Sequence, residues 1–98
     1  MAKKEKVLQS TIAQYLRGKG CFTMVIQPQA GIPQGTADVI ALAPSGRYIY
    51  IEVKAYKGAP YQPLQEHWLN LIASWGQPSY TAYPDNWEQI KTELDAII

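Results

Sequence analysis

The chain has 98 residues, 47% of them hydrophobic and 17% charged, which describes one folded domain spanning residues 1–98 and excludes a disordered chain. One cysteine, Cys21, and one histidine exclude an internal disulfide and disfavour a Cys/His zinc site. No apolar run is long enough to cross a membrane, and the lysine-rich start lacks a following signal-peptide core. We therefore expect a cytoplasmic protein.

The net charge of +1 hides an uneven distribution along the chain. Residues 1–60 carry eight Lys or Arg against three acidic residues, giving +5, whereas residues 61–98 carry one Lys against five acidic residues, giving −4. A basic half suits a polyanion-binding face, although so few charges can also separate by chance. The basic residues that we expect to contact phosphates, with a merely solvated surface as the alternative, are Lys3, Lys4, Lys6, Arg47 and Lys57.

The first predicted element is a helix from Lys3 to Gly18, because apolar residues recur at every fourth position and glycine follows. Glu5 lies beside the apolar stripe of this helix. A carboxylate there needs a partner, or it remains solvated in the first turn, where the helix dipole favours it. The next element is a strand from Cys21 to Gln27, whose nearly continuous apolar character predicts that both of its faces are covered.

A glycine- and proline-rich loop over residues 28–36 leads into a predicted β-hairpin. Two runs of β-forming residues, 38–43 and 47–54, flank the break Pro44-Ser45-Gly46. A three-residue loop with glycine last suits a type I turn closed by a residue in the left-handed region. This turn makes Ala43 face Arg47, and the register of the whole hairpin follows from that pair.

The predicted register gathers three charged residues at the open end of the hairpin. Asp38 lies opposite Glu52, and directly opposed side chains have Cβ atoms roughly 5 Å apart. Lys54 shares a face with Glu52, because side chains alternate along a strand. Two carboxylates that close repel each other, and one keeps its proton unless a cation lies between them. The hairpin therefore predicts a divalent-metal site.

The rest of the chain predicts a helix, a strand and a helix. The first helix runs from Gln62 to Trp75 with Pro63 in its first turn, and Gln65 near its start can point back toward the hairpin. A short strand over Ser79–Tyr83 and a final helix capped by Asp85 follow. The expected core stripe of the helix that begins at Gln62 is Leu64, Trp68, Leu71, Ile72 and Trp75. The whole order predicts an α/β sandwich around a small mixed sheet.

An Asp followed by Glu-x-Lys on the next strand is a pattern typical of metal-assisted phosphodiester cleavage. Asp38 and Glu52 offer hard oxygen ligands suited to Mg²⁺ or Mn²⁺. Lys54 beside them can orient an attacking water or stabilise charge on the phosphate. Glu-x-Lys alone is a weak signal, since Glu and Lys alternate on many exposed strands. Its place at the end of a hydrophobic strand opposite Asp38 makes it stronger.

Motifs spread over most of the chain resemble the VRR-NUC branch of the PD-(D/E)XK nuclease superfamily. They are Glu5-x-x-Leu8-Gln9, Gly31-Ile32-Pro33, Gly35-x-x-Asp38, Ile51-Glu52-Val53-Lys54 and Leu64-Gln65, followed by Gly76. The resemblance implies an αβββαβ restriction-endonuclease-like core, here followed by a C-terminal helix. One departure is Ala37, where the family often has proline before the aspartate.

The resemblance also implies roles for individual residues. It makes Asp38 and Glu52 metal ligands, adds the Val53 carbonyl and Glu5 as further metal-binding positions, and makes Lys54 catalytic. Among the catalytic positions it also places Glu5, on the first helix, and the glutamine that follows the Glu-x-Lys strand, Gln65. The match therefore favours a functional role for Glu5 over the solvated alternative.

These residues together predict a Mg²⁺- or Mn²⁺-dependent DNA endonuclease. The resemblance to small stand-alone members implies a homodimer, in a bacterial or phage-infected cell, that cuts branched DNA such as four-way junctions. We expect no small-molecule cofactor and no membrane partner. Two alternatives remain open at the level of sequence: a catalytically silent nucleic-acid-binding module on the same fold, and a small α/β domain whose hairpin charges form a surface ion cluster.

Overall fold

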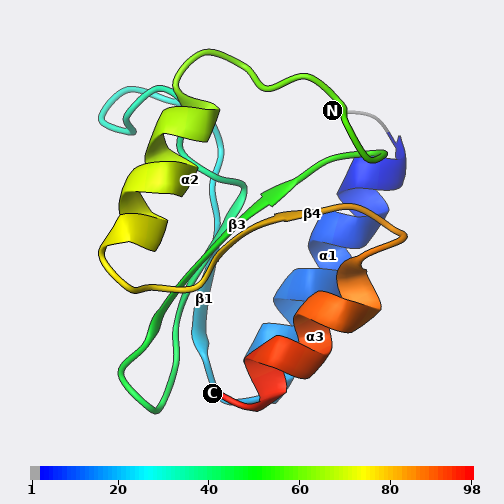
Figure 1. Cartoon of the computed structure of the whole chain (residues 1–98), viewed down its shortest axis with the longest axis vertical. Helices are drawn as coiled ribbons and strands as arrows, with labels where there is room; N and C mark the ends of the chain where they lie inside the picture. The colour runs from blue at the N-terminus through cyan, green and yellow to red at the C-terminus, as the bar shows by residue number, and fades with distance from the viewer. Residues whose placement is uncertain (1–2) are drawn as a thin grey trace.

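The computed structural model describes residues 3–98 as a four-stranded sheet with two helices on one face and one on the other (Figure 1). The first two residues of the predicted domain lie outside the described residues. The elements confirm the predicted α/β class and the order αβββαβ with a C-terminal helix. They are α1 (Lys3–Gly18), β1 (Phe22–Val25), β2 (Val39–Leu42), β3 (Tyr48–Val53), α2 (Gln65–Ser74), β4 (Ser79–Ala82) and α3 (Trp87–Asp95).

The sheet is mixed, with strand order β1-β2-β3-β4. The first two pairs are antiparallel, and β4 runs parallel to β3. The hairpin register is the predicted one, because Val39 pairs with Ile51 and the Ala43 N–H donates to the Arg47 carbonyl over 2.9 Å. Gly46 closes the turn with φ of 90°, a conformation that glycine adopts without a steric penalty.

Side chains of β2 and β3 alternate between two apolar clusters. The larger one lies between the sheet and helices α1 and α3, and the residues that the hairpin contributes to it have odd numbers: Val39, Ala41, Ala43, Ile49, Ile51 and Val53. The smaller one lies under α2 and consists of Ala37, Ile40, Tyr50, Leu69 and Ile72. Because the even-numbered side chains of β2 and β3 face α2, the charged end of the hairpin lies on that face as well.

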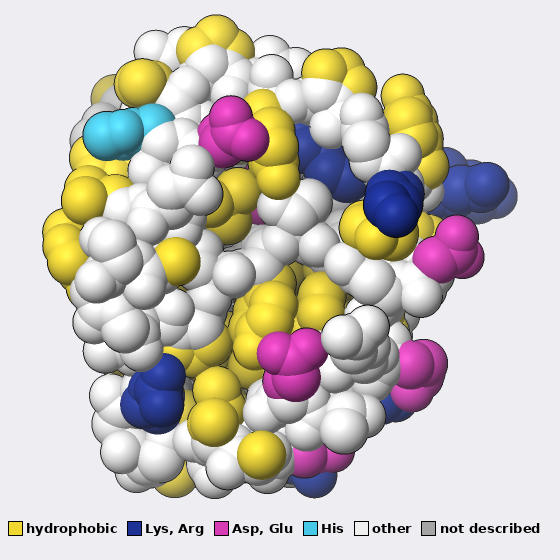
Figure 2. Space-filling view, viewed as in Figure 1, with side chains coloured by type: hydrophobic (Ala, Val, Ile, Leu, Met, Phe, Trp, Pro, Cys, Tyr) yellow, Lys and Arg dark blue, Asp and Glu magenta, His cyan; other side chains and the backbone are white. Residues whose placement is uncertain are grey.

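Charged side chains are spread unevenly over the surface. Figure 2 shows acidic side chains over α3, whose sequence includes Glu88, Glu93 and Asp95, and basic side chains toward the start of α1. Within residues 3–98, no helix combines the length and the apolar character needed to span a bilayer.

The prediction that both faces of the first strand are covered is wrong. Phe22 is 65% exposed and Met24 is 39% exposed. The reason is tertiary: β1 is an edge strand, and α2 packs on β3 and β4 at the other side of the sheet. Leu42, the neighbour of Phe22 on β2, is 47% exposed for the same reason. An apolar patch of these three side chains, Phe22, Met24 and Leu42, therefore lies open on the α2 face.

The predicted bounds and core stripe of the second helix also need correction. Helix α2 begins at Gln65, after Pro63, because Leu64 has φ of 71° and cannot continue a right-handed helix. Leu64 is 47% exposed and Trp75 is 64% exposed, so both predicted core residues lie at the surface. The buried side chains of α2 are Leu69 and Ile72.

The predicted cap of the last helix is wrong by one residue. Asn86, not Asp85, directly precedes α3. The Asn86 side chain accepts a hydrogen bond from the Tyr83 N–H over 2.8 Å and donates one to the Thr81 carbonyl over 2.9 Å. A carboxylate cannot donate, so the amide fastens the connection from β4 to α3 in a way that aspartate cannot. The buried residues of α3 are Trp87, Ile90 and Leu94.

Candidate active site

Asp38 is fixed against β3 by a hydrogen bond to the backbone. It directly precedes β2, and the hairpin register continues from Val39 and Ile51 to place it opposite Glu52. The Val53 N–H donates to Asp38 Oδ2 over 2.8 Å. This bond to a backbone donor orients the carboxylate and holds it beside the end of β3.

Glu52 is a buried carboxylate with incomplete hydrogen bonding. Its side chain is 2% exposed, Oε2 lies 3.4 Å from Lys54 Nζ, and among the described residues Oε1 has no hydrogen-bond partner. Burial, followed by the charge of Asp38, raises the pKa of Glu52 from 4.5 to about 8, against the lowering effect of Lys54. A buried carboxylate oxygen without a partner is costly, and a cation would compensate it.

Lys54 is held from three sides. Its ammonium donates to Gln65 Oε1 over 2.9 Å, forms the ion pair with Glu52, and lies 5.5 Å from the centre of the Tyr61 ring. Gln65 Oε1 also accepts the Gln62 N–H over 2.7 Å, so the amide of Gln65 is itself fixed. The side chain of Lys54 is only 9% exposed, and this low exposure together with its contacts restricts the ammonium to one position.

The start of α2 lies close to Lys54 because the loop before β2 packs directly against the start of this helix. A Cβ on Gly35 would lie 2.6 Å from the carbonyl carbon of Leu64 and 2.8 Å from the nitrogen of Gln65. With φ of 84°, Gly35 also has a conformation that other residues rarely adopt. The Trp68 indole N–H, donating to the Gln34 carbonyl over 2.9 Å, fastens the same loop to the helix.

One cavity of about 280 Å³, which we call the carboxylate cavity, brings these groups together. All six residues predicted to be catalytic or metal-binding line it. Glu5 reaches it from α1, so the cavity joins the first helix to the hairpin and to α2. The lining residues are Glu5, Asp38, Glu52, Val53, Lys54, Tyr56, Ala59, Pro60, Gln62 and Gln65.

The basic residues predicted to bind phosphate divide into two groups. The first turn of α1, which carries Glu5, also carries exposed Lys3, Lys4 and Lys6, and exposed Lys57 follows β3 by four residues. Arg47 lies instead at the closed end of the hairpin, five residues from Glu52 or about 17 Å along an extended strand. There its guanidinium donates to the Gly76 carbonyl over 2.8 Å and to Gln77, and it fastens the connection before β4.

Sequence reasoning missed Tyr61 as a neighbour of Lys54. Its hydroxyl shares a hydrogen bond of 2.8 Å with Thr81 Oγ1 on β4, which places the ring beside the ammonium. The segment from 55 to 64 has no periodicity to predict where a side chain points. The sequence therefore indicates only that a tyrosine follows the Glu-x-Lys strand by a few residues, and not that its ring contacts Lys54.

The donor set fits a hard divalent cation held by few protein ligands. Across residues 3–98, no three His, Cys, Asp or Glu side chains are grouped so that they could enclose a metal by themselves. Two carboxylates, one with a free buried oxygen, nevertheless meet at the carboxylate cavity. Mg²⁺ and Mn²⁺ prefer oxygen ligands, and Mg²⁺ is commonly held by one or two carboxylates with water and substrate phosphate completing its shell. The residues present therefore fit such an ion.

Comparisons with known proteins give the fold but no close relative. No family model and no curated protein matches the sequence. A solved structure described as "VRR_NUC domain" matches with a TM-score of 0.77 and 16% sequence identity, covering 99% of this chain and 100% of that chain. The fold resemblance predicted from the motifs is confirmed. At this identity the match establishes the fold alone, and the activity is inferred from the site.

Proposed function

We propose that this protein is a divalent-metal-dependent endonuclease that hydrolyses phosphodiester bonds in DNA. The observation that supports this best is the carboxylate cavity, where Asp38, Glu52 and Lys54 meet at one end of the hairpin. Glu52 Oε1, which has no hydrogen-bond partner within residues 3–98, would be compensated by a bound cation. The fold match to a VRR_NUC domain points to the same chemistry.

The residues predicted to be catalytic or metal-binding have distinct roles in this proposal. A bound Mg²⁺ or Mn²⁺ supplies electrophilic activation of the phosphate and a lowered pKa for water. Asp38, Glu52 and the Val53 carbonyl are the groups that would hold the ion directly, and Glu5, which lines the same cavity, would reach it through bound water. Lys54 stabilises the negative charge that grows on the phosphate, or orients the attacking water.

Gln65 contributes to catalysis through Lys54. Its amide oxygen accepts from Lys54 Nζ over 2.9 Å, so the ammonium is positioned before substrate arrives. The contact of Lys54 with the Tyr61 ring acts in the same direction. Lys3, Lys4, Lys6 and Lys57 are placed to contact the phosphates of DNA that enters the cavity, and binding should weaken as salt rises.

A second copy of the chain would provide the size that branched DNA requires. The described residues extend over 31 × 26 × 23 Å, which is too small to enclose a junction of several duplex arms. The exposed apolar patch of Phe22, Met24 and Leu42 lies on the edge strand β1 and its neighbour. Unpaired edge strands join readily, and a twofold axis makes one patch complementary to itself. We therefore include a homodimer in the proposal, acting on branched DNA in the cytoplasm of a bacterial or phage-infected cell.

The dimer is tested by mass measurement in solution. Replacing Leu42 by Lys places a charge in the middle of the apolar patch. We expect the unchanged chain to sediment as a dimer and Leu42→Lys as a folded monomer. The matched control is Val7→Lys, at an exposed apolar position of α1 outside the patch. A monomeric unchanged chain contradicts this part of the proposal and leaves the chemistry untouched.

The activity is tested with linear, hairpin, flap and four-way DNA incubated with Mg²⁺ or Mn²⁺. We expect cleavage that chelation of the metal abolishes and that is greatest on the branched substrates. Lys54→Met should remove cleavage, whereas Lys91→Met on α3, a matched change outside the cavity, should retain it. DNA binding without products from any substrate, and without metal binding in calorimetry, would instead identify the protein as a silent binding module.

A further inference from the structure

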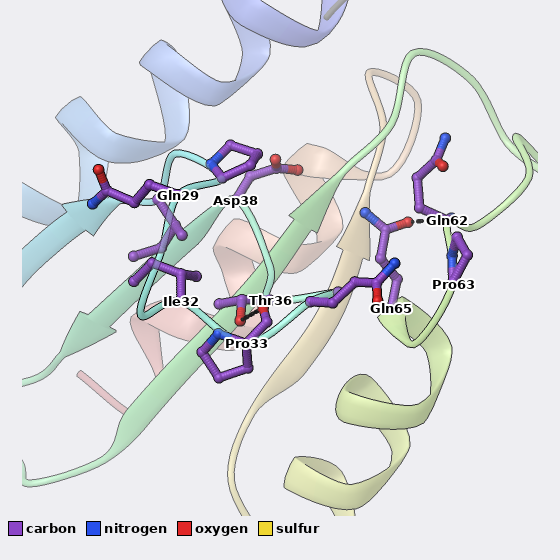
Figure 3. A pocket seen from close by; sticks show the side chains of 12 residues that line it. Gln29, Ile32, Pro33, Thr36, Asp38, Gln62, Pro63 and Gln65 are labelled. Atoms are coloured by element: carbon purple, nitrogen blue, oxygen red, sulfur yellow. Dashed lines mark hydrogen bonds between the residues drawn. The ribbon is translucent and has the colours of Figure 1, made fainter.

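A second, larger cavity of about 400 Å³ adjoins the carboxylate cavity. We call it the loop cavity, because the loop before β2 forms one side of it. Figure 3 shows Ile32, Pro33 and Thr36 of this loop facing Gln62, Pro63 and Gln65, with Asp38 behind them. Its volume is within the range of roughly 300–1,000 Å³ that is usual for ligand pockets.

The lining of the loop cavity differs in kind from that of the carboxylate cavity. Asp38 is the single charged residue among the 12 that line it, and none of the 12 is Lys or Arg. A phosphate would therefore meet a carboxylate there and no cation. The other eleven residues of the lining are uncharged: Ile26, Ile32, Pro28, Pro33, Pro63 and Gly35 are apolar, Gln29, Gln34, Gln62 and Gln65 carry amides, and Thr36 carries a hydroxyl.

This lining matches the chemistry of an uncharged, flat heterocycle. Apolar side chains such as Ile32 and Pro33 give contact surface for the ring faces. The side-chain amides of Gln29 and Gln62 each offer a donor and an acceptor, the groups that pair with the edges of nucleobases. Phosphate recognition is left to the lysines beside the other cavity.

The position of the loop cavity relates it to the proposed cleavage. Both cavities are lined by Asp38, Gln62 and Gln65, so the two cavities are directly adjacent. The loop is also held in place, because Gly35 contacts the backbone at the start of α2 and Gln34 accepts the Trp68 indole N–H. A nucleotide next to the phosphate in the carboxylate cavity is the part of DNA nearest to this space.

We propose that the loop cavity receives an unpaired nucleobase next to the cleaved phosphate. The inference rests on the proposed function and adds the feature of DNA that the site selects. A base inside a duplex is stacked and paired and cannot enter without an unpairing cost of a few kcal/mol, whereas a base at a bulge or branch point enters at little cost. Selection of branched DNA then follows from one unpaired base, without any need to recognise the arms.

The test compares two duplexes that are identical except at one bulged nucleotide, which has adenine in one and lacks a base in the other. Affinity is measured by fluorescence polarisation in Ca²⁺, so that binding is measured apart from cleavage. We expect the unchanged protein to bind the adenine bulge about tenfold more tightly, the effect of one good pair of hydrogen bonds to a base edge. The double variant Gln29→Ala/Gln62→Ala should bind the two duplexes equally, and Gln89→Ala on α3 should keep the preference.

The outcomes separate this inference from the proposed function. Equal affinity of the unchanged protein for the two duplexes, failure to bind either, or a preference that survives in the double variant, overturns the nucleobase site. Cleavage with Mn²⁺ is followed on the same duplexes. A retained base preference without any cleavage supports the nucleobase site and overturns the endonuclease activity. Both glutamines are exposed, and circular dichroism verifies that the double variant is folded.

Discussion

The two faces of the sheet use the same strands for different purposes. On the face covered by α1 and α3, Val39, Ile49 and Ile51 are 0% exposed and belong to one apolar cluster. On the face toward α2, the alternate positions carry Asp38, Glu52 and Lys54 at one end and an open apolar patch at the other. Successive residues of β3 thus divide between stability and chemistry.

The comparison shows how a small domain supports a costly site. Burying the Glu52 carboxylate beside Asp38 opposes folding, and so does burying Lys54. The opposite face compensates with close apolar packing between the sheet and two helices. Because side chains alternate strictly, a variant on one face should change activity and its neighbour on the other face should change stability.

The largest expected effect is the loss of cleavage when a charged residue on the face toward α2 is replaced. Glu52→Gln keeps the size of the side chain and removes its charge. We expect cleavage to fall at least about a hundredfold, since a charged group at the reacting centre is lost, while the protein remains folded. The matched control is Glu66→Gln, an exposed position in the first turn of α2 that should retain full activity. Equal activity of the two variants would contradict the assignment.

The neighbouring residue on the other face should give the opposite result. Ile51→Ala creates a cavity in the larger apolar cluster and should lower the free energy of unfolding by about 2–5 kcal/mol. Leu42→Ala, at a position 47% exposed on the α2 face of one chain, should change it by less than about 1 kcal/mol at protein concentrations too low for the proposed dimer. Urea denaturation measures both. A loss in Leu42→Ala as large as that in Ile51→Ala, under conditions where the protein is monomeric, would contradict the division of roles between the two faces.

The site should also make stability depend on pH when no divalent ion is present. The pKa of Glu52 is raised from 4.5 to about 8 in the folded state, mainly by burial. Stability should therefore be highest below pH 4.5 as far as this group is concerned, and should fall by on the order of a few kcal/mol as the pH rises to about 8, because only the unfolded state ionises freely there.

Denaturation with EDTA at a series of pH values measures this dependence. In Glu52→Gln, the free energy of unfolding should change little between pH 4.5 and about 8. Near pH 8 this variant should be more stable than the unchanged protein. Added Mn²⁺ should recover stability in the unchanged chain but not in the variant. A slope of the same size in both proteins would assign it to other groups.

A smaller effect is expected where the loop meets α2. Gly35→Ala introduces a Cβ that would lie 2.6 Å from the backbone of Leu64, at a φ of 84° that alanine tolerates poorly. We expect a loss of about 1–3 kcal/mol and a displaced start of α2. Cleavage should fall through the broken contact of Gln65 with Lys54. Gly58→Ala, a matched glycine with φ of 83° and open space around it, measures the cost of the backbone conformation alone.

What the sequence by itself determined is local. The turn Pro44-Ser45-Gly46 sets the hairpin register, and the strict alternation of side chains then puts Asp38, Glu52 and Lys54 on one face. These relations need only a turn type and a period of two, so residues close in sequence suffice to predict them. Gln65 was predicted toward the hairpin for a similar reason, its place at the start of a helix.

Only the tertiary structure decided how much of each face is covered and what lies next to the charged groups. The exposure of Phe22 depends on which strands α2 packs against. The left-handed conformation of Leu64 occurs where Gly35 approaches its backbone closely. The Tyr61 contact and the loop cavity arise where irregular segments meet. Such contacts join residues far apart in sequence that have no shared periodicity, and packing alone fixes them.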